Sequence, residues 1–291
     1  MTNIYFFMMM KTVMFATRIT AQHNSFFWNR SLQAYDEFRS HIREPLPSRR
    51  PYAFWDKWRP AFTCPLLDRF GRLSDGGKNV CNWEALFLPR PPSDVLPGVP
   101  PTAPCVLYSF GISGDATFEE ELMERLKQSG CQLYGFDPTV NDFPQRRPGG
   151  VLGSPLATDE PEGHKGPFII HNAEFSKSAL VAPSEKAAAE AKGWNAGTLE
   201  DFMKARNHEW IDILKVDIEG SEWHLFDDIC KKSPKDPTAM PFDMLLIELH
   251  GVHDALLQRF MSCLESHGLY LFAREENLHN SACSNGRGPE T

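Results

Sequence analysis

The stretch that decides the fold runs over residues 211–223 and reads Ile211-Asp212-Ile213-Leu214-Lys215-Val216-Asp217-Ile218-Glu219-Gly220-Ser221-Glu222-Trp223. Its apolar first half predicts a buried strand over 211–216, followed by a tight turn and a helix over 223–230. Glu222 at the helix start suits the positive end of the helix dipole. Asp217 then stands at the carboxyl end of a buried strand, where Lys215, backbone amides, a substrate amine or a cation must satisfy its charge.

On both sides of this stretch, short apolar runs alternate with amphipathic ones. The sequence predicts helices over 118–127, 198–205 and 255–266, and strands over 105–110, 132–136, 168–171, 244–248 and 269–272. Regular alternation of strand and helix indicates βαβ crossovers and a parallel sheet with helices on both faces. The expected fold class is therefore α/β and Rossmann-like, with ligands at the carboxyl ends of the strands.

Composition narrows the class of protein. The chain has 291 residues, of which 42% are hydrophobic and 23% charged, as in ordinary globular proteins. A formal net charge of −8 argues against a nucleic-acid-binding surface, which is usually basic. The seven cysteines form no CxxC pair and argue against zinc. Cys105 and Cys131 are expected to be buried free thiols, and a Cys64–Cys81 bridge would fit a secreted chain.

The sequence divides into three parts. Residues 1–20 contain an apolar stretch too short for a confident membrane span, which suits a signal or anchor, an organelle-targeting segment or a buried terminus. Residues 21–104 are rich in aromatic residues and proline and form an extension and linker, with a helical apolar stripe over 28–42. Residues 105–291 hold the strand–helix pattern and are the expected main domain.

Two further polar features follow predicted strands. Gly111 to Asp115 come after the first strand and lead into a helix, so the backbone can approach a ligand and free amides can attract it. Asp137 ends the second strand, where a carboxylate can accept hydrogen bonds from ribose hydroxyls. The alternatives are a tight turn without a ligand and a turn-forming Asp-Pro pair.

The stretch Lys215 to Glu222 resembles the Lys-x-Asp-x-Glu-Gly-x-Glu signature of the FkbM-type methyltransferases, a branch of the class I S-adenosylmethionine-dependent family. Other segments in the same order resemble the eukaryotic methyltransferase-like members of that branch. These segments are 75–81, 108–120, 134–138, 198–201, 246–250 and 268–277. The resemblance covers residues 71–277, and the combination is more specific than any of its parts.

The resemblance implies a class I methyltransferase domain that binds S-adenosylmethionine over its first three strand ends. The methionine part would lie along the first turn, the ribose on Asp137, and the adenine near the residues after the third strand. The implied cofactor-binding residues are Gly111, Ser113, Gly114, Asp115, Asp137, Asn172 and Ala173.

The acceptor side would be formed by Asp217, beside the sulfonium, with Glu219, Glu248 and His250. His250 has the chemistry of a base near neutral pH, although histidines at strand ends are more often structural. Asp217, Glu248 and His250 could instead gather a divalent cation, but the metal-free arrangement is preferred.

Two positions depart from the family at large, which often has an acidic residue where Ser109 stands and a glycine where Asp115 stands. Class I enzymes usually close the sheet with a final antiparallel hairpin, and we expect its last strand to be short or missing here.

The expected function is S-adenosylmethionine-dependent methyl transfer, with an oxygen as the acceptor atom. One alternative is a noncatalytic binding or scaffold module of the same fold. Another is a different Rossmann-like nucleotide-binding enzyme, which would require a full GxGxxG loop. The acceptor could be a small molecule, a glycan or a protein, whereas nucleic acid is disfavoured. Residues 1–20 are the only segment expected to associate with a membrane. The sequence leaves open whether the protein is cytoplasmic, secretory or organellar.

Overall fold

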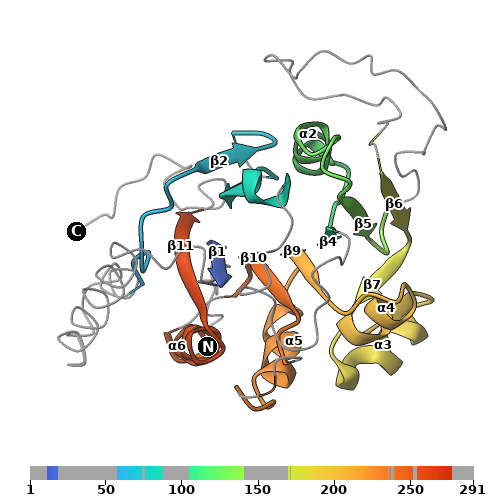
Figure 1. The fold of residues 1–291 in the computed structure, drawn as a ribbon. Coiled ribbons are helices and arrows are strands. Elements are labelled where there is room, and N and C mark those ends of the chain that lie inside the picture. The colour runs from blue at the N-terminus through green and yellow to red at the C-terminus, as the bar shows by residue number, and fades with distance from the viewer. Residues whose placement is uncertain are drawn as a thin grey trace, which may run out of the picture.

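A seven-stranded sheet forms the centre of the molecule in this computed structural model, which describes residues 12–18, 58–73, 76–87, 105–140, 170, 172–234, 236, 239–251 and 254–276. The order of the strands is β11-β1-β10-β9-β4-β5-β6 (Figure 1). Five neighbouring strands from β10 to β6 run parallel. They are β4 (Val106–Phe110), β5 (Gln132–Phe136), β6 (Ala173–Ser176), β9 (Ile211–Val216) and β10 (Phe242–Leu249). The expected Rossmann-like α/β fold is confirmed.

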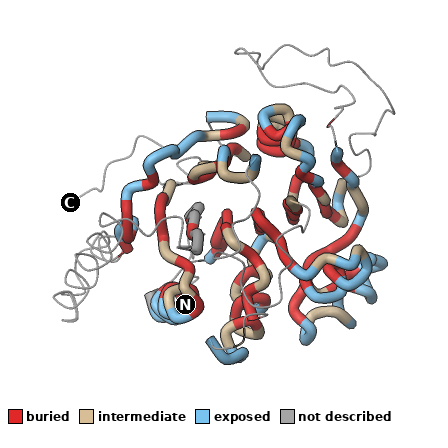
Figure 2. The backbone as a smooth tube through the Cα atoms, viewed as in Figure 1, coloured by how far each residue is buried: buried red, intermediate tan, exposed pale blue. Residues whose placement is uncertain are grey.

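Burial explains why the central strands are apolar throughout. Every residue of β4 and of β9 is buried, as required where both faces of a parallel sheet are covered. Figure 2 shows the central strands of the sheet in the buried colour, with exposed residues on the outer surfaces of the helices. The helices are α2 (Thr117–Arg125), α3 (Lys186–Ala191), α4 (Leu199–Lys204), α5 (Glu222–Ile229) and α6 (Asp254–Ser266).

The two faces of the sheet are covered by different parts of the chain. One core joins the sheet to α4, α5 and α6 through residues such as Phe202, Phe226 and Phe260. On the other face, Phe118 and Leu122 of α2 pack with Phe70 and Val80. Those two residues come from the strand pair β2 (Leu67–Phe70) and β3 (Lys78–Cys81), which precedes the helix η3 (Trp83–Phe87). Figure 1 shows α2 and β2 on the side opposite α5 and α6.

The start of the chain belongs to the sheet. Strand β1 (Thr12–Arg18) lies between β10 and β11 (Leu269–Glu276) and is antiparallel to both. Within β1, Met14 and Ala16 are buried, whereas residues 1–11 lie outside the described part. Because β1 and β2–β3 pack on the same sheet as residues 105–276, the predicted division near Pro104 does not separate two folding units. The predicted helical stripe over 28–42 lies outside the described residues.

The antiparallel closing position of the sheet is filled by a strand that the sequence did not predict. β11 has eight residues, and β1 occupies the antiparallel position that the final strand of the family would fill. The sheet is therefore closed by a strand from the beginning of the chain, a long-range pairing that leaves no local sequence pattern. Beyond β6, a small parallel pair, β7 (Ser178–Leu180) and β8 (Asn195–Gly197), flanks η4 (Pro183–Glu185) and α3.

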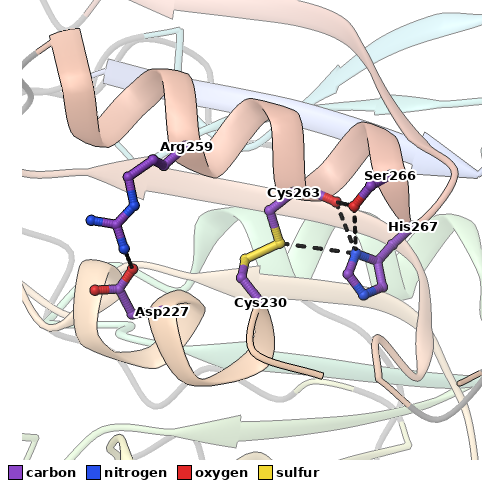
Figure 3. Close-up of a disulfide and its surroundings, with 6 residues drawn as sticks. All are labelled: Asp227, Cys230, Arg259, Cys263, Ser266 and His267. Atoms are coloured by element: carbon purple, nitrogen blue, oxygen red, sulfur yellow. Dashed lines mark hydrogen bonds and ion pairs between the residues drawn. A yellow bond between two sulfur atoms is a disulfide. The ribbon is translucent and has the colours of Figure 1, made fainter. Parts of the chain in front are cut away.

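Six cysteines are paired. Cys105 and Cys131 form a disulfide between the starts of β4 and β5, so the expectation of free thiols is wrong, and Cys64 bridges Cys81. A third disulfide, Cys230–Cys263, was not foreseen and joins α5 to α6 beside the Asp227–Arg259 ion pair (Figure 3). Disulfides of this kind are typical of proteins from oxidising compartments. Among the described residues, no helix has the length and apolar character needed to span a membrane.

Candidate active site

The functional side chains gather where the parallel strands end. The turn after β4 lies between the ends of β9 and β5, because Asp217 N donates to Phe110 O at 2.9 Å and Gly111 N donates to Phe136 O at 2.9 Å. Asp217 follows β9, and Glu248 and His250 lie in and just after the adjacent strand β10. The structure thus brings together the predicted first turn and the predicted acceptor residues.

Gly111 is required by this close approach. Its φ is +80°, and a Cβ placed on it would lie 1.6 Å from the carbonyl oxygen of Asp217. Ser113 also has a positive φ, +54°, whereas a Cβ on Gly114 would meet no atom within 4 Å. The turn therefore presses against Asp217 at its first glycine and is open at its second, which suits a backbone that approaches a ligand.

Asp137 ties the turns after β4 and β5 together. Its Oδ2 accepts hydrogen bonds from Ile112 N at 2.9 Å and Ser113 N at 2.7 Å, and its Oδ1 accepts from the backbone and hydroxyl of Thr139. Burial alone would raise the pKa of Asp137, but the hydrogen bonds from Thr139, Ser113 and Ile112 outweigh it and lower the pKa. The carboxylate is thus placed at the strand end as expected, and it also anchors the first turn.

Asp115 has a structural partner on each oxygen. Oδ1 accepts a hydrogen bond from Thr117 N at 3.0 Å, at the start of α2, and Oδ2 lies 3.1 Å from Arg72 Nε in the turn between β2 and β3. Asp115 therefore connects the first helix to the strand pair from the early part of the chain.

Asn172 and Ala173 require a correction. They were expected to follow a strand over 168–171, but Ile170 is the one residue of that stretch within the described part, and the strand beside β5 is β6, over 173–176. Asn172 O accepts from Leu133 N at the amino end of this pairing. Because parallel strands share one direction, both residues lie at the edge opposite the site, and Ser176 holds the carboxyl end of β6.

Glu119 brings a carboxylate to Ser109, the position on β4 where the family often has an acidic residue. From helix α2 its Oε1 accepts a hydrogen bond from Ser109 Oγ at 2.5 Å and lies 3.1 Å from Lys215 Nζ. Lys215 also donates to Gly111 O at 2.6 Å. Glu119 and Lys215 are both buried, so helix α2 supplies the carboxylate that the sequence of β4 lacks.

Asp217 and Glu248 share a lysine that comes from outside the predicted main domain. Lys78 of β3 places its Nζ 3.4 Å from Glu248 Oε2 and 4.0 Å from Asp217 Oδ2. Burial and the charge of Glu248 raise the pKa of Asp217 to about 6, against the opposing effects of Lys215, Lys78 and His250. Asp217 therefore changes its charge close to physiological pH.

His250 is held by the last glutamate of the 215–222 signature. Glu222 accepts hydrogen bonds from Ile218 N at 2.9 Å and Gly220 N at 3.0 Å, and its Oε1 lies 3.0 Å from His250 Nδ1. Since Glu222 acts as an acceptor, we assign the proton to Nδ1. The other ring nitrogen, Nε2, faces Glu219 at 3.3 Å and Asp217 at 3.9 Å.

The same region contains a group of side chains with the chemistry of a cation site. Ligand atoms of Asp217, Glu222 and His250 lie within 4.8 Å of one another. Glu222 replaces the Glu248 that was considered from the sequence, and its oxygens already accept two amide hydrogen bonds. Lys78 already supplies a positive charge beside the Asp217 and Glu248 carboxylates, so we assign no metal role to this group.

Three important residues were missed by sequence reasoning. Lys78 and Glu119 lie far from the signature in sequence, and only the quoted similarity around 75–81 and 108–120 drew attention to their segments. Glu222 was interpreted through the helix dipole, whereas its oxygens hold the turn and the His250 ring. The signal for Glu222 was its place at the end of the 215–222 motif.

Comparison with known proteins agrees with this geometry. A family model described as "Methyltransferase FkbM domain" matches residues 110–269, and one described as "Methyltransferase domain" matches residues 15–148. The curated relatives include "Probable methyltransferase-like protein 24" from Rattus norvegicus and from Homo sapiens, each 25% identical to this chain. No solved structure shows a significant match.

These matches have a defined extent. The rat protein aligns over 128 residues, which are 44% of this chain and 29% of the relative, and the human protein aligns over 129 residues, or 43% and 28%. The aligned region therefore spans less than a third of the curated relatives. The FkbM model covers more than half of the chain and includes the first turn, Asp137, the signature and His250. On that basis the chain belongs to the methyltransferase FkbM family.

Proposed function

We propose that the protein uses S-adenosylmethionine to methylate an oxygen atom of its acceptor. The observation that carries this proposal is the placement of His250, between Glu222 on one side and Asp217 and Glu219 on the other, at the strand ends beside the glycine turn. An acceptor hydroxyl must lose a proton during transfer, and an oriented imidazole is suited to take it.

The residues around the first turn fit the cofactor. Open space at Gly114 leaves the backbone accessible there, and Asp137 lies at the next strand end. Gly111, Ser113 and Gly114 would hold the methionine part, and Asp137 the ribose. When bound, S-adenosylmethionine supplies an electrophilic methyl group.

The chain's own groups handle the proton. Glu222 fixes the His250 ring with its Nδ1 proton inward, so that Nε2 can accept a proton from the acceptor hydroxyl. Asp217 and Glu219 lie close to Nε2 and stabilise the positive charge that the ring then carries. The proposal requires only that the acceptor carry a hydroxyl group. The acceptor can be a small molecule, a glycan or a protein.

The test is calorimetry with S-adenosylmethionine and S-adenosylhomocysteine, followed by incubation of the protein and labelled cofactor with a fractionated extract. Binding together with a labelled product supports the proposal. Binding without any product favours the noncatalytic module of the same fold. Folded protein that binds neither compound excludes the enzyme.

Replacing Asp137 with alanine should weaken binding of S-adenosylhomocysteine at least tenfold. The substitution removes the expected ribose contacts and also releases Ile112 N and Ser113 N, which now donate to this carboxylate. Asp201→Ala is a suitable control, because it removes a capping carboxylate at α4 instead. Equal affinity of Asp137→Ala and wild type would show that the cofactor is placed wrongly.

Asp217 should make activity depend on pH. The value of kcat/KM is expected to rise as pH increases through about 6, because Asp217 then loses its proton and stabilises the protonated His250 ring. Asp217→Asn should remove this rise. Because its pKa is higher in the folded protein than in the unfolded chain, the ionised form of Asp217 destabilises the fold by up to about 3 kcal/mol above pH 6. Below pH 4, Asp217 is protonated in both states and the effect is absent. Asp217→Asn should therefore raise the melting temperature at pH 7 while lowering activity.

A further inference from the structure

We propose that Lys78 is a positioning residue of the acceptor site, delivered by the β2–β3 hairpin to hold the Asp217 and Glu248 carboxylates together. This inference rests on the proposed methyl transfer, since it assigns a role at the same site. It concerns a residue that lies outside the FkbM match and 139 positions before Asp217 in the sequence.

The contacts of Lys78 support the assignment. Its side chain is 1% exposed, and Nζ lies 3.4 Å from Glu248 Oε2 and 4.0 Å from Asp217 Oδ2. Burying an ammonium is costly unless it is paired, so these carboxylates are the reason that Lys78 can be buried. Lys215, the other lysine near Asp217, directs its Nζ to Gly111 O and to Glu119 instead.

The hairpin is held rigidly enough to position a charge. The Cys64–Cys81 disulfide closes the end of β3, and Arg69 and Asn79 both contact Glu275 on β11. At the turn, Gly71 N donates to Glu121 Oε2 of α2 at 2.8 Å. These links connect the hairpin to both the sheet and α2, so they fix the position of Lys78 relative to the Asp217 and Glu248 carboxylates.

The charge balance explains what Lys78 does. Asp217 faces Lys78 from β3, Lys215 from its own strand, Glu248 from β10 and His250 from the loop after β10, while Glu219 faces the His250 ring. Asp217 and Glu248 repel each other, and without a nearby cation one of the two carboxyl groups retains its proton to higher pH. Lys78 therefore preserves the negative charge that the His250 ring needs when it accepts a proton.

The first experiment needs no acceptor. Carbon-13 NMR of the side-chain carboxyl groups, with the Asp217 signal assigned by its loss in Asp217→Asn, follows the titration of Asp217 directly. Lys78→Met should move its midpoint upward by about one unit or more, and Lys78→Arg should restore it. An unchanged midpoint in Lys78→Met overturns the proposal, whether or not methyl transfer is ever observed.

The second experiment uses the extract fraction that the wild-type protein methylates. Lys78→Met should lower kcat at least tenfold and move the pH profile upward, with S-adenosylhomocysteine affinity within twofold of wild type. Lys78→Arg should recover most of the rate. If all variants bind the cofactor and the wild type methylates nothing, the proposed function fails, but the NMR result still decides the role of Lys78.

A pair of disulfide variants covers the case in which Lys78→Met does not fold. The double change Cys64→Ser/Cys81→Ser loosens the hairpin and should shift the Asp217 titration upward and reduce kcat. Cys230→Ser/Cys263→Ser is the matched control, because it removes the disulfide between α5 and α6 (Figure 3), in which Cys230 lies at the end of α5 opposite Glu222. Equal titration midpoints in the two double variants would overturn the delivery of Lys78 by the hairpin.

Discussion

Gly111→Ala should leave the protein unfolded or lower its melting temperature by about 10 °C, with loss of cofactor binding. At φ +80°, a side chain is already strained, and the added Cβ would lie 1.6 Å from the Asp217 carbonyl oxygen. The turn after β4 and the loop after β9 would have to separate, which would break the hydrogen bond from Asp217 N to Phe110 O. We expect a destabilisation of more than about 3 kcal/mol.

Gly114→Ala is the matched control for this prediction. It lies three residues later in the same turn, has no positive φ, and its Cβ would meet no atom within 4 Å. Thermal unfolding should be close to that of wild type, although cofactor affinity should fall if the ligand approaches the backbone there. Similar melting temperatures for Gly111→Ala and Gly114→Ala would contradict the close contact between the turn and Asp217.

Glu119→Ala should have the second largest effect, a loss of about 3 to 5 kcal/mol of stability. Burial opposes the charge on Lys215, but Glu119 and Asp217 outweigh this effect and raise the pKa of the lysine. Without Glu119, the ammonium remains buried beside Ser109 and Gly111 O and loses its ion-pair partner at 3.1 Å. Chemical denaturation monitored by tryptophan fluorescence measures the change.

Two controls make this result specific. Glu119→Gln keeps an acceptor for the Ser109 hydroxyl and removes only the charge, so it should lie between wild type and Glu119→Ala. Glu200→Ala removes the exposed ion pair with Lys204 on α4, which should leave the denaturation midpoint unchanged. A Glu119→Ala protein as stable as Glu200→Ala would mean that Lys215 does not depend on Glu119.

Much of the fold was predictable because its signals are local. The strands at 132–136 and 211–216 were predicted with their observed limits, and the other helices and strands of residues 105–140 and 198–276 lie close to their expected ranges. The third strand was assigned too early because the apolar run at 168–171 outweighed the more polar β6, which reads Ala173-Glu174-Phe175-Ser176. Short edge strands of this kind carry a weak periodic signal.

The site was predictable where one motif carried several of its parts. Asp217 and Glu219 belong to the signature, and His250 follows the next strand of the parallel sheet, so the topology alone places them at one edge. Lys78, Glu119 and the β1 strand could not be found in the same way. Their contacts join segments far apart in the chain, and a pattern of apolar residues says which face is buried but not what covers it.

The sequence by itself determined the order of strands and helices in residues 105–140 and 198–276, the family and the edge of the sheet where the chemistry lies, because these depend on side-chain periodicity and on motifs within a few residues. Only the tertiary structure decided that the first strand closes the sheet, that α2 supplies the missing carboxylate and that the hairpin brings Lys78 to Asp217. The physical reason is that buried charges need partners in space, and the partner is chosen by packing rather than by position along the chain.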